Sequence, residues 1–192
     1  MRKLMMKMSI SLDGFVAAAN GKGDWMFKAA DEKSSAWVRE LCESAGLHIM
    51  GSKSFHDMAP YWPTSPLPIA RAMNEIPKAV FTQKGMTIPP AADQSPAAVS
   101  WAGTRIFNGD LAGEIRQLKA EPGQPILAHG GAGFMRSLIE TGLIDEYHLV
   151  VHPVALGAGL PIFSDLSQPL ELKLVDTNVF PGGIVVHTYH PA

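Results

Sequence analysis

Residues 126–153, ILAHGGAGFMRSLIETGLIDEYHLVVHP, decide the fold of this chain. The stretch begins with a short apolar run, passes through the glycine cluster HGGAGF, and continues into a segment whose apolar residues suit a helix. It ends in EYHLVVHP, which predicts a strand. Glycine costs backbone entropy in any ordered element, so the cluster of Gly130, Gly131 and Gly133 needs a local reason. The order strand, glycine turn, helix and strand is typical of an α/β sheet.

The same alternation extends through the rest of the chain. Asp13-Gly14 ends the first apolar run, Gly46 follows the first helical pattern, and Pro181-Gly183 separates two strand-like runs in the tail. These signals predict an α/β sheet, mainly parallel, with antiparallel strands at its C-terminal edge. Further strands are expected at 3–10, 47–50, 79–81, 98–101 (AVSW), 170–180 and 183–190, helices at 31–45, from Ser52 and at 111–120, and irregular chain at 64–78 and 85–97.

Composition bounds the class of protein. A chain of 192 residues with no shift in composition is read as one domain, 1–192. Its net charge of −2 gives no field that would draw nucleic acid or an anionic membrane. No apolar run approaches 18 residues, and Lys7 and Asp13 interrupt the apolar N-terminus. The single cysteine, Cys42, fits a reducing compartment, so a cytoplasmic location is expected, with Cys42 as a small buried helix residue.

Two glycine turns lie where an α/β sheet binds ligands. HGGAGF joins a strand to a helix, and ligands of open α/β sheets sit beyond the carboxyl ends of the strands. Glycine lets backbone N–H groups approach a pyrophosphate, and the helix dipole favours its charge. MGSKSF, residues 50–55, forms a second such junction, so the two turns could hold one dinucleotide. A tight turn alone explains HGGAGF equally well, and Lys53 alone reads as a solvated lysine.

Five ordered stretches carry a family resemblance over almost the whole chain. The most specific is LIDEYHLVVHPVALGAGLPIF at 143–163. The chain resembles the dihydrofolate reductase-like superfamily and, more closely, the C-terminal reductase domain of the bifunctional riboflavin-biosynthesis deaminase/reductase and its stand-alone relatives. The other four stretches are SISLDGFVA at 9–17, IMGSKSF at 49–55, KAVFTQ at 78–83 and ILAHGGAGFM at 126–135.

The resemblance implies a three-layer fold with about eight strands, and NADPH bound across the two glycine turns as the donor of hydride to a small heterocyclic substrate. It also implies a homodimer paired through the C-terminal region of the sheet, which the tail GIVVHTY suits, although a core strand would have the same composition. Asp13, Trp25 and the pair Pro153-Val154 would border the nicotinamide and substrate pocket. The residues implied to contact the cofactor are Gly51, Ser52, Lys53, Ser54, Thr82, Gln83, Gly130, Gly131, Ala132, Gly133 and Phe134.

Departures from the family pattern bear on cofactor and substrate. Relatives often place arginine after the glycine of the first turn, to meet the NADP 2′-phosphate. This chain has Ser52 and then Lys53, so preference for NADPH over NADH is weakened and NADH stays open. The carboxylate that folate reductases carry about one turn before a tryptophan is replaced by Ser34 or Ser35. Asp31 and Glu32 lie one turn too early, unless a shifted helix brings either of them inward.

These departures leave the substrate open. Classical folate reduction is not expected. Riboflavin-pathway reduction is not expected either, because this sequence shows neither the deaminase half with its zinc-binding Cys and His nor an extra basic cluster for a ribose phosphate. The alternative to a reductase is a nucleotide- or ligand-binding relative that has lost turnover. An assay of NADPH oxidation with different acceptors would separate the two.

Several residues keep two interpretations. Asp13 either donates or relays a proton, or serves as a turn residue bonded to backbone. The loop 18–30, with Trp25, is either a lid over a pocket or ordinary surface packing. His129 either lines the pocket or is a core histidine. No metal site is expected, because His148 and His152 on one strand lie roughly 13 Å apart.

Overall fold

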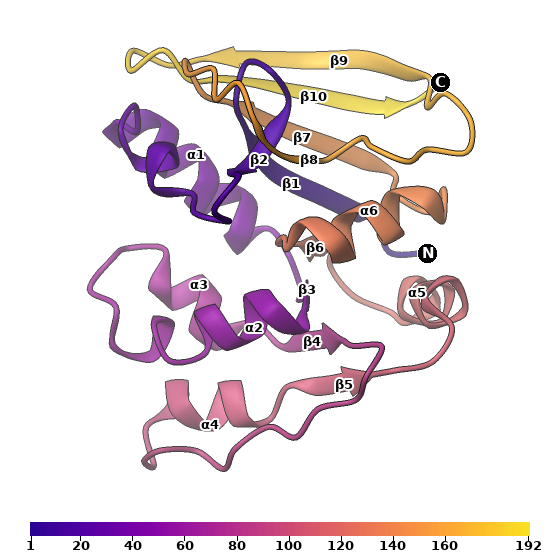
Figure 1. Ribbon diagram of the computed structural model, residues 1–192. Helices are drawn as coiled ribbons and strands as arrows, with labels where there is room; N and C mark the ends of the chain where they lie inside the picture. The colour runs from indigo at the N-terminus through magenta and orange to yellow at the C-terminus, as the bar shows by residue number, and fades with distance from the viewer.

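The computed structural model describes residues 1–192 and has an eight-stranded sheet at its centre (Figure 1). The strand order is β5-β4-β3-β6-β1-β7-β10-β9. Neighbouring strands are parallel from β5 to β7, and β10 and β9 are antiparallel to their neighbours. The predicted α/β sheet with an antiparallel C-terminal edge is therefore confirmed. The strands are β1 (Leu4–Ile10), β3 (Leu47–Gly51), β4 (Lys78–Phe81), β5 (Arg105–Phe107), β6 (Ile126–Ala128), β7 (Glu146–Val151), β9 (Leu172–Val179) and β10 (Val185–Pro191).

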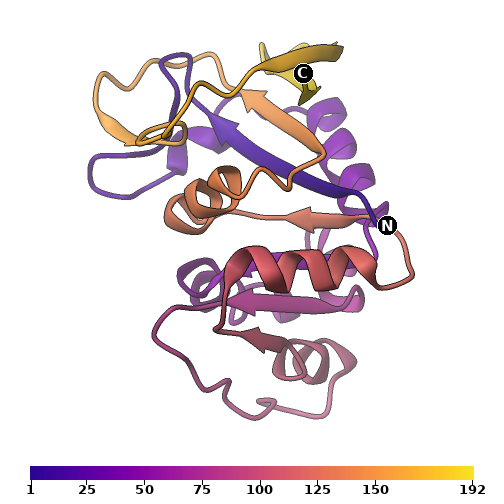
Figure 2. The same ribbon diagram turned by 90° about the vertical axis from the view of Figure 1, so that its right-hand side faces the viewer.

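Helices cover both faces of the sheet and give the expected three layers (Figures 1 and 2). On one face, Ile115 of α5 and Leu138 of α6 pack with Met6 and Ile126 in the larger apolar core. On the opposite face, α1 to α4 enclose a second core. The helices are α1 (Glu32–Glu43), α2 (Ser52–Met58), α3 (Ala70–Glu75), α4 (Pro96–Ala102), α5 (Leu111–Ala120) and α6 (Ala132–Glu140), with 3-10 turns η1 (Asp24–Phe27) and η2 (Trp62–Thr64).

Alternation along the central strand β1 places its polar residues on the α1 side. Leu4, Met6, Met8 and Ile10 belong to the core under α5 and α6. Met5 belongs to the core under α1 to α4, together with Cys42, which is buried as expected. Successive side chains of a strand point to opposite faces, so Lys7 and Ser9 share the α1 side with Met5.

Two expectations about the middle of the chain were wrong. Residues 98–101 are helical, in α4, because the Ser95 hydroxyl accepts from the Ala98 N–H and Pro96 fills the first helical position. This start signal outweighs the β-propensity of Val-Ser-Trp, and the strand lies later, at β5. The range 64–78 contains α3, and a small antiparallel ribbon of β2 (Phe15–Ala18) and β8 (Gly159–Pro161) was not expected.

The tail forms the expected hairpin, with Gly183 at a φ of 89° in its turn. Its second strand, β10, lies inside the sheet between β7 and β9, and Ile184 and Val186 are buried. The GIVVHTY segment is therefore a core strand rather than an outer surface. The edge strand at this end of the sheet is β9.

None of the helices combines the length and hydropathy that crossing a membrane requires.

Candidate functional site

The residues implied to hold a cofactor come together at the carboxyl ends of three adjacent strands. In β3 and β4, Gly51 lies opposite Phe81, and in β3 and β6, Ile49 lies opposite Ala128. The chain segments that leave these strands therefore start side by side. They carry Gly51 to Ser54, Thr82 with Gln83, and Gly130 to Phe134.

The two glycine turns touch each other. The Gly131 N–H donates to the Ser54 hydroxyl at 2.7 Å, and the Gly51 N–H donates to the Gly130 carbonyl at 3.4 Å. A Cβ on Gly51 would lie 2.7 Å from the Phe134 Cβ, so no larger residue fits there. Gly130 has a φ of +68°, which favours glycine. Packing and backbone conformation thus explain these glycines without any ligand.

Gly133 is different, because nothing in the protein requires glycine there. Its φ is not positive, and an added Cβ would meet no atom within 4 Å. It is exposed in the first turn of α6, where alanine would favour the helix by roughly 0.5–1 kcal/mol. A residue that the fold does not need, in open space beside a helix start, leaves room for a group from outside the chain.

The same turn offers unused hydrogen-bond donors. No side chain caps α6, and the N–H groups of Ala132, Gly133 and Phe134 donate to no protein acceptor. First-turn N–H groups and the helix dipole together bind anions well. The residues present therefore fit a pyrophosphate at Ala132 to Phe134, whereas Ser54 already occupies the Gly131 donor.

Three phenylalanines stack beneath this turn. The rings of Phe134 and Phe81 lie 5.2 Å apart and nearly parallel, and Phe81 stacks on Phe107 at 5.1 Å. The Arg105 guanidinium lies 5.1 Å from the Phe107 ring centre. The stack fixes the start of α6 against β4 and β5, so the Phe134 ring has a structural role in addition to its backbone donor.

Lys53, in the first turn, is paired with one of the protein's own carboxylates. Lys53 Nζ lies 3.0 Å from Asp57 Oδ2, and both side chains are largely exposed. Lys53 matches the interpretation as a solvated lysine, and a 2′-phosphate would have to compete with Asp57 for it.

Asp13, at the end of β1, serves as an acceptor for backbone and hydroxyl groups. Its carboxylate accepts from the Ser11 hydroxyl at 2.6 Å, from the Leu156 N–H at 3.0 Å and from the Gly157 N–H at 2.7 Å. The Ser11 bond, followed by the Leu156 bond, lowers the pKa of Asp13 to about 2. This geometry favours the turn interpretation: an ionised Asp13 joins the loop after β1 to the loop after β7.

Asp31 and Ser34 cap helix α1 instead of facing a substrate. Asp31 accepts from the Ser34 N–H at 2.8 Å, and the Ser34 hydroxyl accepts from the Asp31 N–H at 3.0 Å. The other Asp31 oxygen accepts from the Gly182 N–H at 2.6 Å, and these N–H bonds, from Ser34 first, lower the pKa of Asp31. Ser35 is exposed on the helix. The Asp31 carboxylate is therefore not free to bind a substrate.

Trp25 and His152 form a buried polar pair beside the end of β7. Their rings meet edge to face at 5.3 Å, and Trp25 Nε1 and both His152 ring nitrogens have no hydrogen-bond partner. Burial, followed by the charge of Lys7, lowers the pKa of His152 to about 4. Pro153 packs against the hairpin turn at Gly183, and the Val154 carbonyl accepts from the Leu12 N–H. Trp25 of the 18–30 loop is thus packed inside.

Lys7 is the residue that the sequence reasoning missed. It lies half-buried on the α1 side of β1, and its ammonium donates to no protein acceptor. Desolvation lowers the pKa of Lys7, partly opposed by Cys42. His129 Nε2 is also buried without a partner, and burial, then His48 and Lys7, lower the pKa of His129. A lysine inside the apolar run LMMKMSI was the available signal.

Unpaired polar groups thus collect on the α1 side of β6, β1 and β7. Buried polar groups are normally hydrogen-bonded. Several buried polar groups without a hydrogen bond in one region therefore indicate a missing partner, which a bound molecule or water would supply. Lys7 carries only donors, and the Trp25 indole is a donor. No three His, Cys, Asp or Glu side chains gather in a way that could hold a metal ion.

Comparison with known proteins assigns the class and then the family. The fold is that of the dihydrofolate reductase-like superfamily: Enterococcus faecalis dihydrofolate reductase, solved with NADP(H) and RAB-propyl, matches with a TM-score of 0.60 and 14% identity over 98% of this chain and 96% of that one. The RibD C-terminal domain family matches residues 2–186, so this chain belongs to that family.

Two relatives match almost end to end. A Shewanella sp. PV-4 protein named for riboflavin biosynthesis matches with a TM-score of 0.77 and 22% identity over 99% of both chains. The uncharacterized protein YyaP of Bacillus subtilis (strain 168) is 30% identical over 98% of this chain and 95% of its own length. Membership of this family and its reductase neighbours support a reductase-type function.

Proposed function

We propose that this protein is an NAD(P)H-dependent reductase that transfers hydride to a small heterocyclic substrate other than dihydrofolate. The family supports the reductase class, and the solved E. faecalis relative holds NADP(H). The observation that carries the proposal in this chain is the open position at Gly133 beside three unused N–H donors. A pyrophosphate is the group of a dinucleotide that such a position fits.

Different residues along the carboxyl edge would bind the coenzyme and donate the proton. Ala132, Gly133 and Phe134 would hold the pyrophosphate, and the nicotinamide, when bound, supplies the hydride. On the α1 side, the Lys7 ammonium would lie near the substrate and offer a proton to the atom that gains negative charge. The lowered pKa of Lys7 brings it closer to the range that suits a general acid at neutral pH.

Asp13 would act through position only. An ionised carboxylate that already accepts three hydrogen bonds has no proton to give at neutral pH. Its part would be to keep the loops after β1 and β7 together beside the substrate. The substrate-side residues Trp25, Pro153 and Val154 stay in the proposal, while Asp31 and Ser34 are used as a helix cap.

Binding of NADPH and NADH to the Gly133→Ala variant tests the cofactor part. The added methyl group enters the space reserved for the pyrophosphate, so we expect affinity to fall about tenfold or more while the melting temperature is unchanged or slightly higher. Gly103→Ala, at a negative φ of −81° with ordinary contacts, is the matched control. Equal coenzyme affinity of wild type and Gly133→Ala would remove the basis of the proposal.

A binding protein without turnover is the second candidate. It is favoured by one observation: the carboxylates of Asp13 and Asp31 both accept hydrogen bonds from backbone N–H groups, so neither can act as an acid. NADPH oxidation measured across pterins, flavins, nitro compounds and quinones separates the two. Coenzyme binding with no oxidation in any pairing would favour the second candidate.

The homodimer and the cytoplasmic location remain proposals that rest on the resemblance and the composition. Because β10 lies inside the sheet, the proposed dimer interface is the edge strand β9, where Leu174, Val175 and Val179 are exposed. Light scattering after size-exclusion chromatography tests the dimer. A monomer at micromolar concentration would contradict it.

A further inference from the structure

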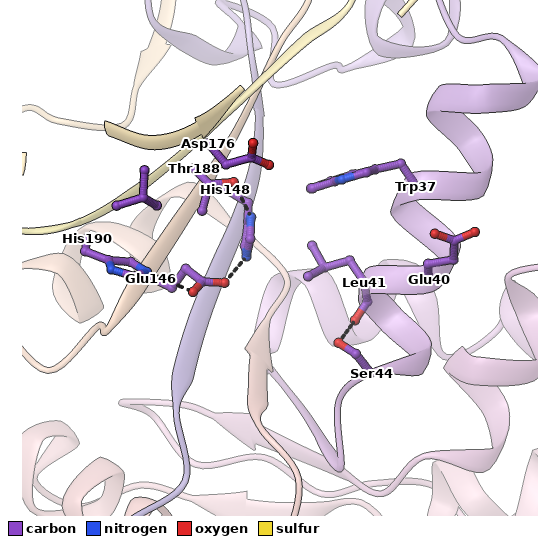
Figure 3. A pocket seen from close by; sticks show the side chains of 10 residues that line it. Trp37, Glu40, Leu41, Ser44, Glu146, His148, Asp176, Thr188 and His190 are labelled. Carbon is purple, nitrogen blue, oxygen red and sulfur yellow. Dashed lines mark hydrogen bonds and ion pairs between the residues drawn. The ribbon is translucent and has the colours of Figure 1, made fainter. Parts of the chain in front are cut away.

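A second hollow lies away from the carboxyl edge, between the second half of α1 and the strands β7, β10 and β9 (Figure 3). Its volume is about 450 Å³, within the range of small-molecule sites. Trp37 and Glu40 of α1 face Asp176, Thr188 and His148 of the strands across it. No residue implied to bind cofactor or substrate lines this hollow.

The hollow exists because the sheet face changes character under α1. Near the start of the helix, Val150, Ile184 and Val186 are buried and form an apolar cluster with Trp37. Farther along the same face, β7 carries His148 and Glu146 and β10 carries Thr188 and His190. Ionisable side chains cannot be covered by a helix as closely as apolar ones, because burying an unpaired charge costs free energy. A polar floor is left open.

The floor is organised around one carboxylate. Glu146, 14% exposed, lies 2.7 Å from Lys3 Nζ and 3.0 Å from His190 Nε2. His148, 6% exposed, meets the Thr188 hydroxyl through Nδ1 at 3.1 Å. Its Nε2 lies 2.8 Å from Glu146 Oε1, so both histidines meet the same carboxylate (Figure 3).

The rim carries negative charge that nothing in the protein neutralises. Glu40 and Asp176 are exposed and have no basic side chain within 4.0 Å. Asp176 accepts only from the neighbouring Asn178 amide, at 2.7 Å. Burial lowers the pKa of His148, against the raising effect of Glu146, so its imidazole is neutral at pH 7. The lining holds three carboxylates and no lysine or arginine, so the hollow favours a positively charged ligand.

Trp37 adds an aromatic surface to this charge. The indole extends from α1 into the hollow and meets the His148 ring at 5.6 Å, edge to face (Figure 3). Its Nε1 donates to no protein acceptor. An aromatic face next to unpaired carboxylates recognises organic cations, through attraction between the charge and the ring.

We propose that this hollow binds a small organic cation, an amine or a guanidinium- or amidinium-bearing molecule. The cation would lie against Glu40 and Asp176, with its carbon body on Trp37 and His148. None of the residues that line the hollow is among those implied to bind the coenzyme, so the site is separate from the coenzyme site and does not depend on the proposed reductase activity.

Benzamidine and its neutral counterpart benzamide test the proposal by NMR. The chain has four tryptophans, and the Trp37→Phe variant identifies the Trp37 indole N–H signal. We expect benzamidine to shift this signal saturably at millimolar concentration or below, while benzamide shifts it little. Glu40→Gln and Asp176→Asn should each weaken benzamidine about two- to fivefold, and together more. Glu140→Gln, an exposed carboxylate on α6, is the matched control and should bind like wild type.

Dispersed amide spectra of each variant show that it is folded, so a loss of binding can be attributed to the charge. Equal shifts from benzamide and benzamidine would overturn the proposal, and so would undiminished binding by the double variant. Saturating NADPH should leave the benzamidine affinity within about twofold. Full competition by NADPH would mean that the cation binds at the coenzyme site instead.

Discussion

The two halves of the carboxyl edge offer ligands different chemistry. At β6, β3 and β4 the donors are backbone N–H groups of an exposed helix start at Ala132 to Phe134. At β1 and β7 they are side chains, Lys7, Trp25 and His152, held on the α1 face without partners. The first half needs only glycine and a helix to be formed. The second half needs side chains from distant parts of the chain, so its properties respond to different substitutions.

Lys7→Met gives the largest expected difference between the halves. Removing the ammonium should reduce NADPH oxidation, with the best acceptor of the panel, by about 100-fold or more if it supplies a proton. Coenzyme affinity should stay near that of wild type, because the pyrophosphate half is untouched. Stability to urea should hold or rise, since an unpaired, partly desolvated charge is lost. Turnover equal to that of the exposed control Arg116→Met would show that Lys7 takes no part.

Gly51→Ala and Gly133→Ala compare two glycines of the backbone half. At Gly51 the new Cβ would collide with Phe134, so we expect a loss of about 1–3 kcal/mol in the free energy of unfolding. At Gly133 the space is open, so the change should stay within about 0.5 kcal/mol. Urea denaturation measures both. Equal destabilisation by the two substitutions would mean that the two turns do not differ as described.

Lowering the pH should protonate histidines of the side-chain half, whereas the backbone N–H donors of the other half do not titrate. The pKa of His152 is about 4 in the folded protein, below its ordinary value near 6.5, so between these pH values the unfolded chain binds a proton that the native protein does not. The free energy of unfolding should therefore fall as the pH drops from about 6.5 to about 4, by up to about 1.4 kcal/mol per pH unit. His48 is shifted in the same direction and adds to this slope.

The His152→Leu variant isolates that contribution. It should be less sensitive to pH in this window than wild type, whereas Gly103→Ala should follow the wild-type curve. Urea midpoints measured at several pH values provide the comparison. An unchanged slope in His152→Leu would mean that His152 is not held neutral by burial.

Asp57→Asn gives the smallest expected effect. It releases Lys53 from its exposed ion pair, and such pairs contribute about 0.2–1 kcal/mol. If Lys53 meets the 2′-phosphate, affinity for NADPH should rise about two- to threefold, and affinity for NADH should not change. A parallel rise for both coenzymes, measured by calorimetry, would place Lys53 away from the 2′-phosphate.

Most of the fold could be predicted because its signals are local. The glycine clusters and the apolar runs each act within a few residues, and they predicted the helices and strands around them. The prediction failed at 98–101, where the Ser95-Pro96 start signal was overlooked in favour of β-propensity. The position of β10 inside the sheet could not be predicted, because it depends on β9 folding back beyond it.

The candidate site could be predicted only in its backbone half. Glycine spacing marks a turn, and the turn lies at the carboxyl edge in every α/β sheet of this kind. Asp13 and Asp31 were ambiguous because a carboxylate looks the same in sequence whether it binds backbone or substrate. Their N–H partners, Gly157 and Gly182, lie more than 140 residues away.

The sequence by itself determined the alternation of strands and helices and the two glycine turns, because backbone preference and apolar periodicity are set by near neighbours. Only the tertiary structure decided that Gly51 is filled by Phe134 while Gly133 stays open, and that Lys7 and His152 are left without partners. Open space and missing hydrogen bonds are properties of contacts between distant segments, so they exist only once the chain has folded.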